Sequence, residues 1–185
     1  LLFNQIINKH TSFPINRLGT NYFIGDVHAH YDLLMDKLDN RNFDPSAGDI
    51  LYSVGDIVNY GKQSSDCVEL LLKYWFKACL GNHEAMLLAF IKDTSLKETL
   101  VKMGGQWCLD LYVNEPSRIK FLVAIIFSKM FCSMTVNTVY GSIGVVHAQA
   151  PDDWQQAVDG NLDLATAFWS MDKFKRPGGD ILNVD

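Results

Sequence analysis

The chain has 185 residues, of which 48% are hydrophobic, and this is enough for one compact domain with a substantial core. The formal net charge of −5 argues against nonspecific nucleic-acid binding, because such binding needs a basic surface. No apolar stretch approaches the roughly 20 residues that a membrane-spanning helix requires. We therefore expect neither a nucleic acid nor a membrane as a partner.

The four cysteines are scattered along the chain and form no CxxC pair. Residues 1–10 lack a basic segment followed by an apolar stretch and a small-residue cleavage site, so we expect no secretory signal. Both observations favour buried thiols in a reducing compartment and a cytoplasmic protein. A zinc or disulfide framework is the less favoured alternative. The cysteines are Cys67, Cys79, Cys108 and Cys132.

The first half of the chain alternates short apolar runs with segments of helical periodicity. Strands are predicted at residues 22–24, 50–54 and 76–80. Helices are predicted at 31–38 and 64–75, and a third begins over 84–90. Residues 42–48 contain Pro45 and Gly48 and are predicted to form a loop. The repeated order of strand, loop and helix predicts an α/β sheet with functional side chains at the carboxyl ends of its strands.

Two of these helices are expected to lay an apolar face on the sheet. In the first helix the expected face consists of Leu33, Leu34 and Leu38. In the second helix it consists of Cys67, Leu70, Leu71 and Tyr74. The second helix opens with Ser64-Ser65-Asp66, which is predicted to cap its N-terminus.

The second half begins with a mostly helical region over residues 92–129, interrupted at Gly104-Gly105 and at Pro116. Strands are predicted at 132–139 and 142–146, separated by Tyr140-Gly141. A loop and then a helix are predicted over 154–169, and a candidate strand lies within 176–185. No internal repeat or charged linker is present, so a single domain over 1–185 is the simplest organisation.

Three predicted strands end in a glycine followed by a residue that can bind metal, and a fourth ends in a histidine. Each motif alone is more typical of a turn or a helix cap, and a lone histidine at a strand end is usually a core residue. Their joint occurrence at four strand ends favours a metal site. The motifs are Gly25-Asp26-Val27-His28, Gly55-Asp56, Gly81-Asn82-His83-Glu84 and His147.

Oxygen and imidazole donors of this kind suit a centre of two divalent cations. Asp26 and His28 are two residues apart, so an extended chain would direct both side chains to one ion. Asp56 is predicted to bridge the two ions, and Asn82 with His147 would complete the second site. Such a pair, about 3.5–4 Å apart, grips a phosphoryl group and activates a bridging water for attack on phosphorus.

The other histidines receive different predictions. His83 is adjacent to a ligand and precedes a helix, so it is predicted to protonate the leaving alkoxide. His10 is expected to be a surface residue near a frayed terminus. His30 is expected to be an exposed residue in the first turn of a helix.

The quoted motifs, with His147-Ala148, resemble the metallophosphoesterase (calcineurin-like) superfamily, in particular the bacterial and phage branch of the phosphoprotein phosphatases. The resemblance covers about residues 21–169. It implies a β-sandwich flanked by helices and a dinuclear centre of Mn²⁺, with Fe, Zn²⁺ or Mg²⁺ as alternatives. It also implies hydrolysis of Ser/Thr or Tyr phosphoesters, or of dinucleoside polyphosphates in a sibling branch. The substrate would be a phosphorylated protein or a small phosphoester.

The chain departs from the family pattern near the expected phosphate site. The family aspartate that orients the acid histidine is replaced by Asn59, which would support His83 as a neutral hydrogen-bond partner. The family arginine that clamps phosphate is replaced by Tyr60, which offers one hydroxyl to the substrate. Met171 stands where a second arginine is usual, and Ala29 replaces a glycine, a mild change if its φ is negative.

The family pattern also ends with a Gly-His-Thr segment whose histidine ligates the second metal, and no such segment follows His147. Either the domain is incomplete or interrupted near Gly178, with 181–185 as the strand that follows the missing loop, or the second site lacks a ligand. A working metal-dependent phosphoesterase is the favoured interpretation. A catalytically impaired phosphatase that binds metal or a phospho-ligand is the alternative, and a protein without any site is the least favoured. The oligomeric state is left open.

Overall fold

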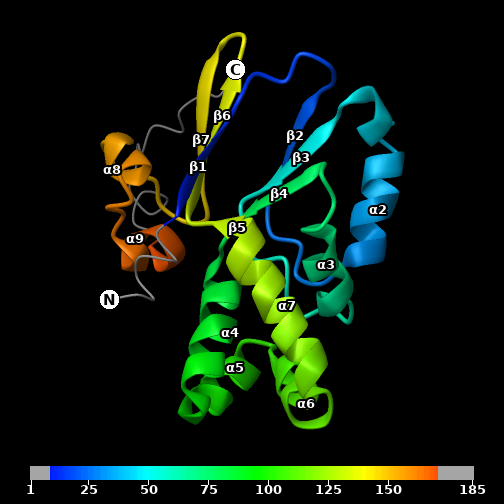
Figure 1. The fold of residues 1–185 in the computed structure, drawn as a ribbon, viewed down its shortest axis with the longest axis vertical. Helices are drawn as coiled ribbons and strands as arrows, with labels where there is room; N and C mark the ends of the chain where they lie inside the picture. Colours follow the sequence, from blue (N-terminus) through cyan, green and yellow to red (C-terminus); the bar gives the residue numbers. More distant parts are fainter. Residues whose placement is uncertain (1–8, 171–185) are drawn as a thin grey trace, which may run out of the picture.

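The computed structural model describes residues 9–170, and its strands form two sheets that face each other (Figure 1). One sheet is parallel throughout and has the order β2-β3-β4-β5. The other has the order β1-β6-β7, with β1 parallel and β7 antiparallel to β6. The strands are β1 His10–Phe13, β2 Asn21–Ile24, β3 Ile50–Ser53, β4 Phe76–Cys79, β5 Met130–Phe131, β6 Ser133–Thr138 and β7 Gly141–Val146.

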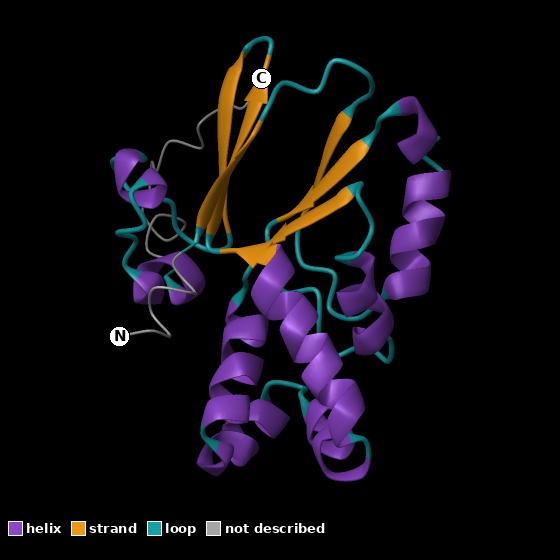
Figure 2. Cartoon of the chain, in the orientation of Figure 1, coloured by secondary structure: helices purple, strands orange, loops and turns teal. Residues whose placement is uncertain are grey.

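Helices cover the outer sides of this β-sandwich, as expected from the family resemblance (Figure 2). Helices α2 and α3 lie along the parallel sheet, α4 to α7 form a cluster below it, and α8 and α9 lie beside the other sheet. The helices are α2 Tyr31–Asp39, α3 Ser64–Leu70, α4 Asn82–Lys92, α5 Lys97–Lys102, α6 Gln106–Asn114, α7 Pro116–Lys129, α8 Gln155–Val158 and α9 Leu164–Trp169. Two short 3-10 helices are Pro45–Ala47 and Thr94–Leu96.

The central strands β3 and β4 of the parallel sheet are covered on both faces, which explains why apolar residues dominate their sequences. Successive side chains of a strand point to opposite faces. Leu51 therefore packs into the large cluster on the helical side, whereas Tyr52 packs into the smaller cluster that also contains Met134 and Val136 of β6. The second cluster fills the space between the two sheets. The expected mixed α/β sandwich is confirmed.

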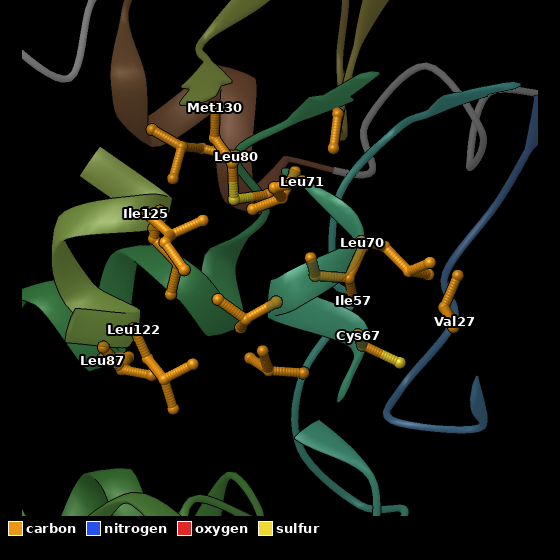
Figure 3. Packing of buried hydrophobic residues seen from close by; sticks show 14 of the residues in the cluster. Val27, Ile57, Cys67, Leu70, Leu71, Leu80, Leu87, Leu122, Ile125 and Met130 are labelled. Carbon is orange, nitrogen blue, oxygen red and sulfur yellow. The ribbon is translucent and has the colours of Figure 1, made fainter. Parts of the chain in front are cut away.

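The helical side of the parallel sheet forms the main core (Figure 3). Cys67 and Leu70 of α3 point into it, and so do Leu122 and Ile125 of α7. All four cysteines are buried free thiols, as expected. Residues 9–170 include no helix that is long and apolar enough to cross a membrane.

Helix α3 is shorter than predicted, because it ends at Leu70 rather than at residue 75. From Leu71 onward the amide groups bond to carbonyls three residues back, which turns the chain toward β4. Tyr74 consequently leaves the predicted apolar face and is 66% exposed. The predicted cap is also wrong: the cap residue is Gln63, and the hydroxyl of Ser64 instead accepts the amide N–H of Asn59 at 3.1 Å.

Other local predictions also need correction. Leu34 and Leu38 of α2 are buried as expected, but Leu33 is 54% exposed and lies off the apolar face. His10 is not a frayed surface residue, because it begins the unpredicted strand β1 and its Nδ1 lies 2.9 Å from the Ser133 hydroxyl. Strands β1 and β5 have four and two residues, too few for a detectable alternation. His30 is exposed at the start of α2, as expected.

Candidate metal centre

The four strand ends singled out in the sequence meet at one edge of the sandwich. The loop after β2 is bonded to the loop after β3, because the amides of Val27 and His28 both donate to the Asp56 carbonyl, at 3.1 and 2.9 Å. The amide of His83, at the start of α4, donates to Asp56 Oδ1 at 3.0 Å. His147 follows β7 of the opposite sheet, and its Nε2 lies 3.4 Å from Asp56 Oδ2. The predicted convergence is therefore observed.

The donor atoms form two groups that share Asp56. One group consists of His28, Asp56 and His83, and the other of Asp26, Asp56 and His147; within each group the donors lie within 4.8 Å of one another. A shared carboxylate is the arrangement that two neighbouring cations require. The structure also brings His83 into a donor group, whereas the sequence assigned it only the role of an acid.

The orientation of Asp56 suits a bridging role. Its Oδ1 accepts the His83 amide, which fixes the carboxylate against the N-terminus of α4. Its Oδ2 faces the site and lies 3.4 Å from His147 Nε2 and 3.8 Å from His83 Nε2. The Asp56 side chain is almost fully buried. One oxygen is thus held by the fold, and the other is available to cations.

The surroundings of His147 fit a metal ligand. Its Nδ1 is buried and has no hydrogen-bond partner, and an unpartnered buried polar atom is costly. This atom lies 4.0 Å from Asp26 Oδ1, and Nε2 of the same ring lies 2.9 Å from Asn82 Oδ1. Carboxylate, amide and imidazole donors therefore converge on this ring, as expected of a cation site.

Asp26 and His28 meet, but not for the reason that the sequence suggested. The chain is not extended there, because His28 has a φ of +45°. Its Nε2 nevertheless lies 3.8 Å from Asp26 Oδ2. His28 Nδ1 donates to the Val58 carbonyl at 3.2 Å, which leaves Nε2 to face the donors.

The backbone around the site is strained at several positions. Among residues 9–170, six non-glycine residues have a positive φ, and five of them lie in these loops. They are His28, Ala29, Asp56, Asn59 and Tyr60. Each costs of order 1–3 kcal/mol and persists only when its surroundings enforce it. The φ of Ala29 is +58°, so the condition for a mild change is not met, and replacing the family glycine is not a mild change.

Glu84 holds the loop after β3, including Asp56, and the motifs alone did not reveal this role. Its fully buried carboxylate accepts four amide N–H groups, at 2.9 to 3.2 Å. Burial, and secondarily the charge of Asp56, raises the pKa of Glu84 to about 7 against the lowering effect of these amides. The signal available in the sequence was the glutamate three residues after the N-cap Gly81, the spacing of a capping box. The four amides belong to Asp56, Ile57, Val58 and Gly81.

Gly81 permits the close approach of the second and third loops. A Cβ at this position would lie 2.0 Å from Asp56 Oδ1, whereas a Cβ at Gly25 would meet nothing within 4 Å. We expect Gly81→Ala to displace the carboxylate and to weaken Mn²⁺ binding by roughly 10–100-fold, the usual effect of disturbing a ligand's support. Gly25→Ala is the matched control. Calorimetric titration that gave the two variants the same affinity would contradict this role of Gly81.

A chain of hydrogen bonds runs from His83 through Asn59 to Trp107. Its Nδ1 lies 2.8 Å from Asn59 Nδ2, and Asn59 Oδ1 accepts the indole N–H of Trp107 at 2.7 Å. Trp107 was not identified from the sequence, because it lies 48 residues from Asn59. Burial is the main cause that lowers the pKa of His83; His28 and His147 add to it, while Asp56 and the Met103 carbonyl oppose it.

Tyr60 lies at the open side of the same histidine. Its ring makes edge-to-face contacts with His83 and His28, with centroids 5.0 and 4.9 Å apart. The Tyr60 residue is 62% exposed, so it covers the two imidazoles and still faces solvent. Met171, Gly178 and residues 181–185 lie outside the described residues.

Comparison with known proteins agrees with this geometry. Residues 21–179 match the family model of calcineurin-like phosphoesterases. The chain belongs to this family. It is therefore related to hydrolases of phosphoric esters, as the motifs predicted.

Named relatives of the family fall into two groups. The chain is 31% identical to serine/threonine-protein phosphatase 1 of Salmonella typhimurium, over 89% of this chain and 74% of that protein. It is 38% identical to the symmetrical bis(5'-nucleosyl)-tetraphosphatase of Actinobacillus succinogenes, over 75% of this chain and 47% of that protein. A crystal structure described as a candidate diadenosine tetraphosphatase shares 26% identity and a TM-score of 0.54, over 78% of this chain and 58% of that one.

Proposed function

We propose that this phosphoesterase hydrolyses phosphomonoesters, with a phosphorylated protein as its substrate, on a centre of two divalent cations. The observation that carries the proposal is the shared position of Asp56, whose Oδ2 faces donors of both groups. Asp26, His28, Asp56, Asn82 and His147 are the proposed ligands. When bound, the cations would lower the pKa of a water molecule and polarise the phosphoryl group.

The other site residues are proposed to act on the substrate. His83 Nε2 faces the donors, so it can donate a hydrogen bond to the leaving oxygen. Asn59 positions His83, and the hydroxyl of Tyr60 would contact the substrate in place of a cationic clamp. A serine, threonine or tyrosine phosphoester is the proposed bond, which agrees with the activity named for the Salmonella relative. We propose Mn²⁺ as the metal, because carboxylate and amide oxygens stand beside imidazoles.

A second candidate is the hydrolysis of dinucleoside polyphosphates, which the likeness to the named tetraphosphatases favours. A third is a catalytically impaired protein that binds metal without turnover, since two phosphate-binding arginines are replaced. We further propose a single domain over 1–185 in the cytoplasm, because its four thiols are buried and unpaired. The net charge of −5 argues against a nucleic-acid partner.

Turnover with added metal tests the proposal directly. We expect the protein with Mn²⁺ to hydrolyse p-nitrophenyl phosphate, and a chelator or His147→Gln to abolish this activity. His30→Gln, on an exposed histidine outside both donor groups, is the matched control. Diadenosine tetraphosphate tested in parallel separates the second candidate. Calorimetric metal binding without turnover of either compound would indicate the impaired protein.

A further inference from the structure

Trp107, Asn59 and His83 form a chain of hydrogen bonds, and the indole N–H of Trp107 fixes the direction of donation along it. Trp107 Nε1 donates to Asn59 Oδ1 at 2.7 Å. An indole N–H can only donate, so the oxygen of the Asn59 amide must face Trp107 and its NH₂ group must face His83. Asn59 is fully buried and its backbone N–H donates to the Ser64 hydroxyl, so the residue is held on both sides.

The orientation of this amide decides where His83 carries its proton. Asn59 Nδ2 lies 2.8 Å from His83 Nδ1 and approaches it as a donor. Nδ1 must therefore accept, which places the proton of the neutral ring on Nε2. An aspartate at position 59 would accept from both Trp107 and Nδ1, and the bond to the histidine would run in the opposite direction.

The tautomer determines what His83 can give to a substrate. Nε2 lies 3.8 Å from Asp56 Oδ2, so its N–H points toward the donor groups. A neutral imidazole can stabilise a leaving oxygen by hydrogen bonding. Full transfer of its proton would create an imidazolate beside the Asp56 carboxylate, which is unfavourable in a buried site. The leaving group must then depart as an anion.

We propose that Trp107 and Asn59 are positioning residues that hold His83 as a neutral Nε2–H donor, so that the site prefers phosphoryl compounds with an acidic leaving group. This proposal rests on the proposed function and narrows its preferred phosphoesters from those of serine, threonine and tyrosine to those of tyrosine. Aryl phosphates and phosphoanhydrides have such leaving groups, whereas alkyl phosphates such as phosphoserine do not. Water adds to phosphorus, the P–O bond breaks, and the leaving oxygen keeps the bonding electron pair. The phosphate product retains both protons of the water, and the departing anion takes its proton from solvent.

The surroundings include one group that supports this preference and one that opposes it. Tyr60 is exposed and lies edge-to-face against His83, so its ring could pack against an aromatic leaving group. The Met103 carbonyl favours the protonated His83 ring and thus opposes the neutral state of the imidazole. A direct observation of the proton is therefore the first test.

Long-range ¹H–¹⁵N spectra of the Mg²⁺-loaded protein report the tautomer independently of activity. We expect His83 to show an unprotonated Nδ1 and a protonated Nε2. Asn59→Asp should reverse this assignment. Trp107→Phe should remove the bond that orients the Asn59 amide, so both tautomers of His83 should be populated. Trp154→Phe is the matched control, because it removes an indole donor that binds Thr135 instead. A protonated Nδ1 in the unaltered protein would overturn the proposal.

The second test compares leaving groups. We expect kcat/KM to fall steeply from p-nitrophenyl phosphate to phosphotyrosine and then to phosphoserine. Diadenosine tetraphosphate, measured in parallel, shows whether phosphoanhydrides or aryl phosphates are the preferred class. Asn59→Asp should raise the ratio of phosphoserine to p-nitrophenyl phosphate turnover by ~10²-fold, since general-acid catalysis contributes at least this much. Equal turnover of all esters would refute the preference while the proposed function stands. No turnover of any probe, with the Nε2–H tautomer present, would refute the function and retain the positioning role.

Discussion

Asp56→Asn should abolish most of the Mn²⁺-dependent hydrolysis of p-nitrophenyl phosphate. The asparagine keeps an oxygen for the His83 amide, so the turn should survive, but the charged Oδ2 that faces both donor groups is lost. Because bound cations contribute several kcal/mol of charge stabilisation and 1.36 kcal/mol is tenfold in rate, we expect a loss of roughly 10³-fold.

The same substitution should weaken metal binding, and two measurements separate this effect from unfolding. Calorimetry should show that at least one Mn²⁺ site is lost, while the urea midpoint stays near that of the unaltered protein. Asp36→Asn removes an equivalent charge on the exposed side of α2 and should change neither quantity. Full activity of the Asp56 variant would rule out a bridging carboxylate at this position.

Glu84→Gln is expected to produce the largest loss of stability among conservative changes near the site. The carboxylate accepts four buried amides, two on each oxygen. A glutamine would direct an NH₂ group at two of these amides and leave them without an acceptor. Each unsatisfied buried group costs about 1–3 kcal/mol, which relief of the buried charge partly offsets, so we expect a net loss of about 2–3 kcal/mol.

Urea unfolding monitored by circular dichroism tests this expectation. A loss of this size should lower the midpoint by about 1 M for a domain of this length. Glu98→Gln, on an exposed position of α5, is the control and should stay within about 0.5 kcal/mol. If the two variants unfold at the same midpoint, the Glu84 hydrogen bonds do not hold the loop. Metal affinity should fall together with stability, because the loop that Glu84 holds carries Asp56.

The buried central strands of the parallel sheet were the most predictable part of the fold. Strands β3 and β4 are covered on both faces, so apolar residues dominate their sequences, and their ends were predicted to within one residue. Strand β1 escaped prediction because its four residues are only partly buried and its pairing partner is more than 120 residues away. Helix α3 ends earlier than predicted because the amides after Leu70 bond to carbonyls three residues back instead of continuing the helix. The periodicity of apolar residues does not reveal this change in hydrogen bonding.

The candidate site likewise contains residues that the sequence identified and residues that it did not. Asp26, His28, Asp56, Asn82 and His147 were found because their residue types are distinctive and each follows an apolar run. Glu84 looked like an ordinary first-turn glutamate, although three of its four hydrogen bonds go to a loop 26 to 28 residues away in sequence. Trp107 looked like one more aromatic residue of a helical region. Neither role can be detected without knowing which segments are adjacent in space.

The family resemblance, the residue types that can bind cations and their placement after strands could all be read from local pattern and composition. The spatial arrangement was needed to find that Asp56 belongs to both donor groups, that the loops adopt left-handed backbone, and that Trp107 orients the Asn59 amide beside His83. These features arise from close approaches between segments such as Gly81 and Asp56, and distances between remote segments are set by packing rather than by local order.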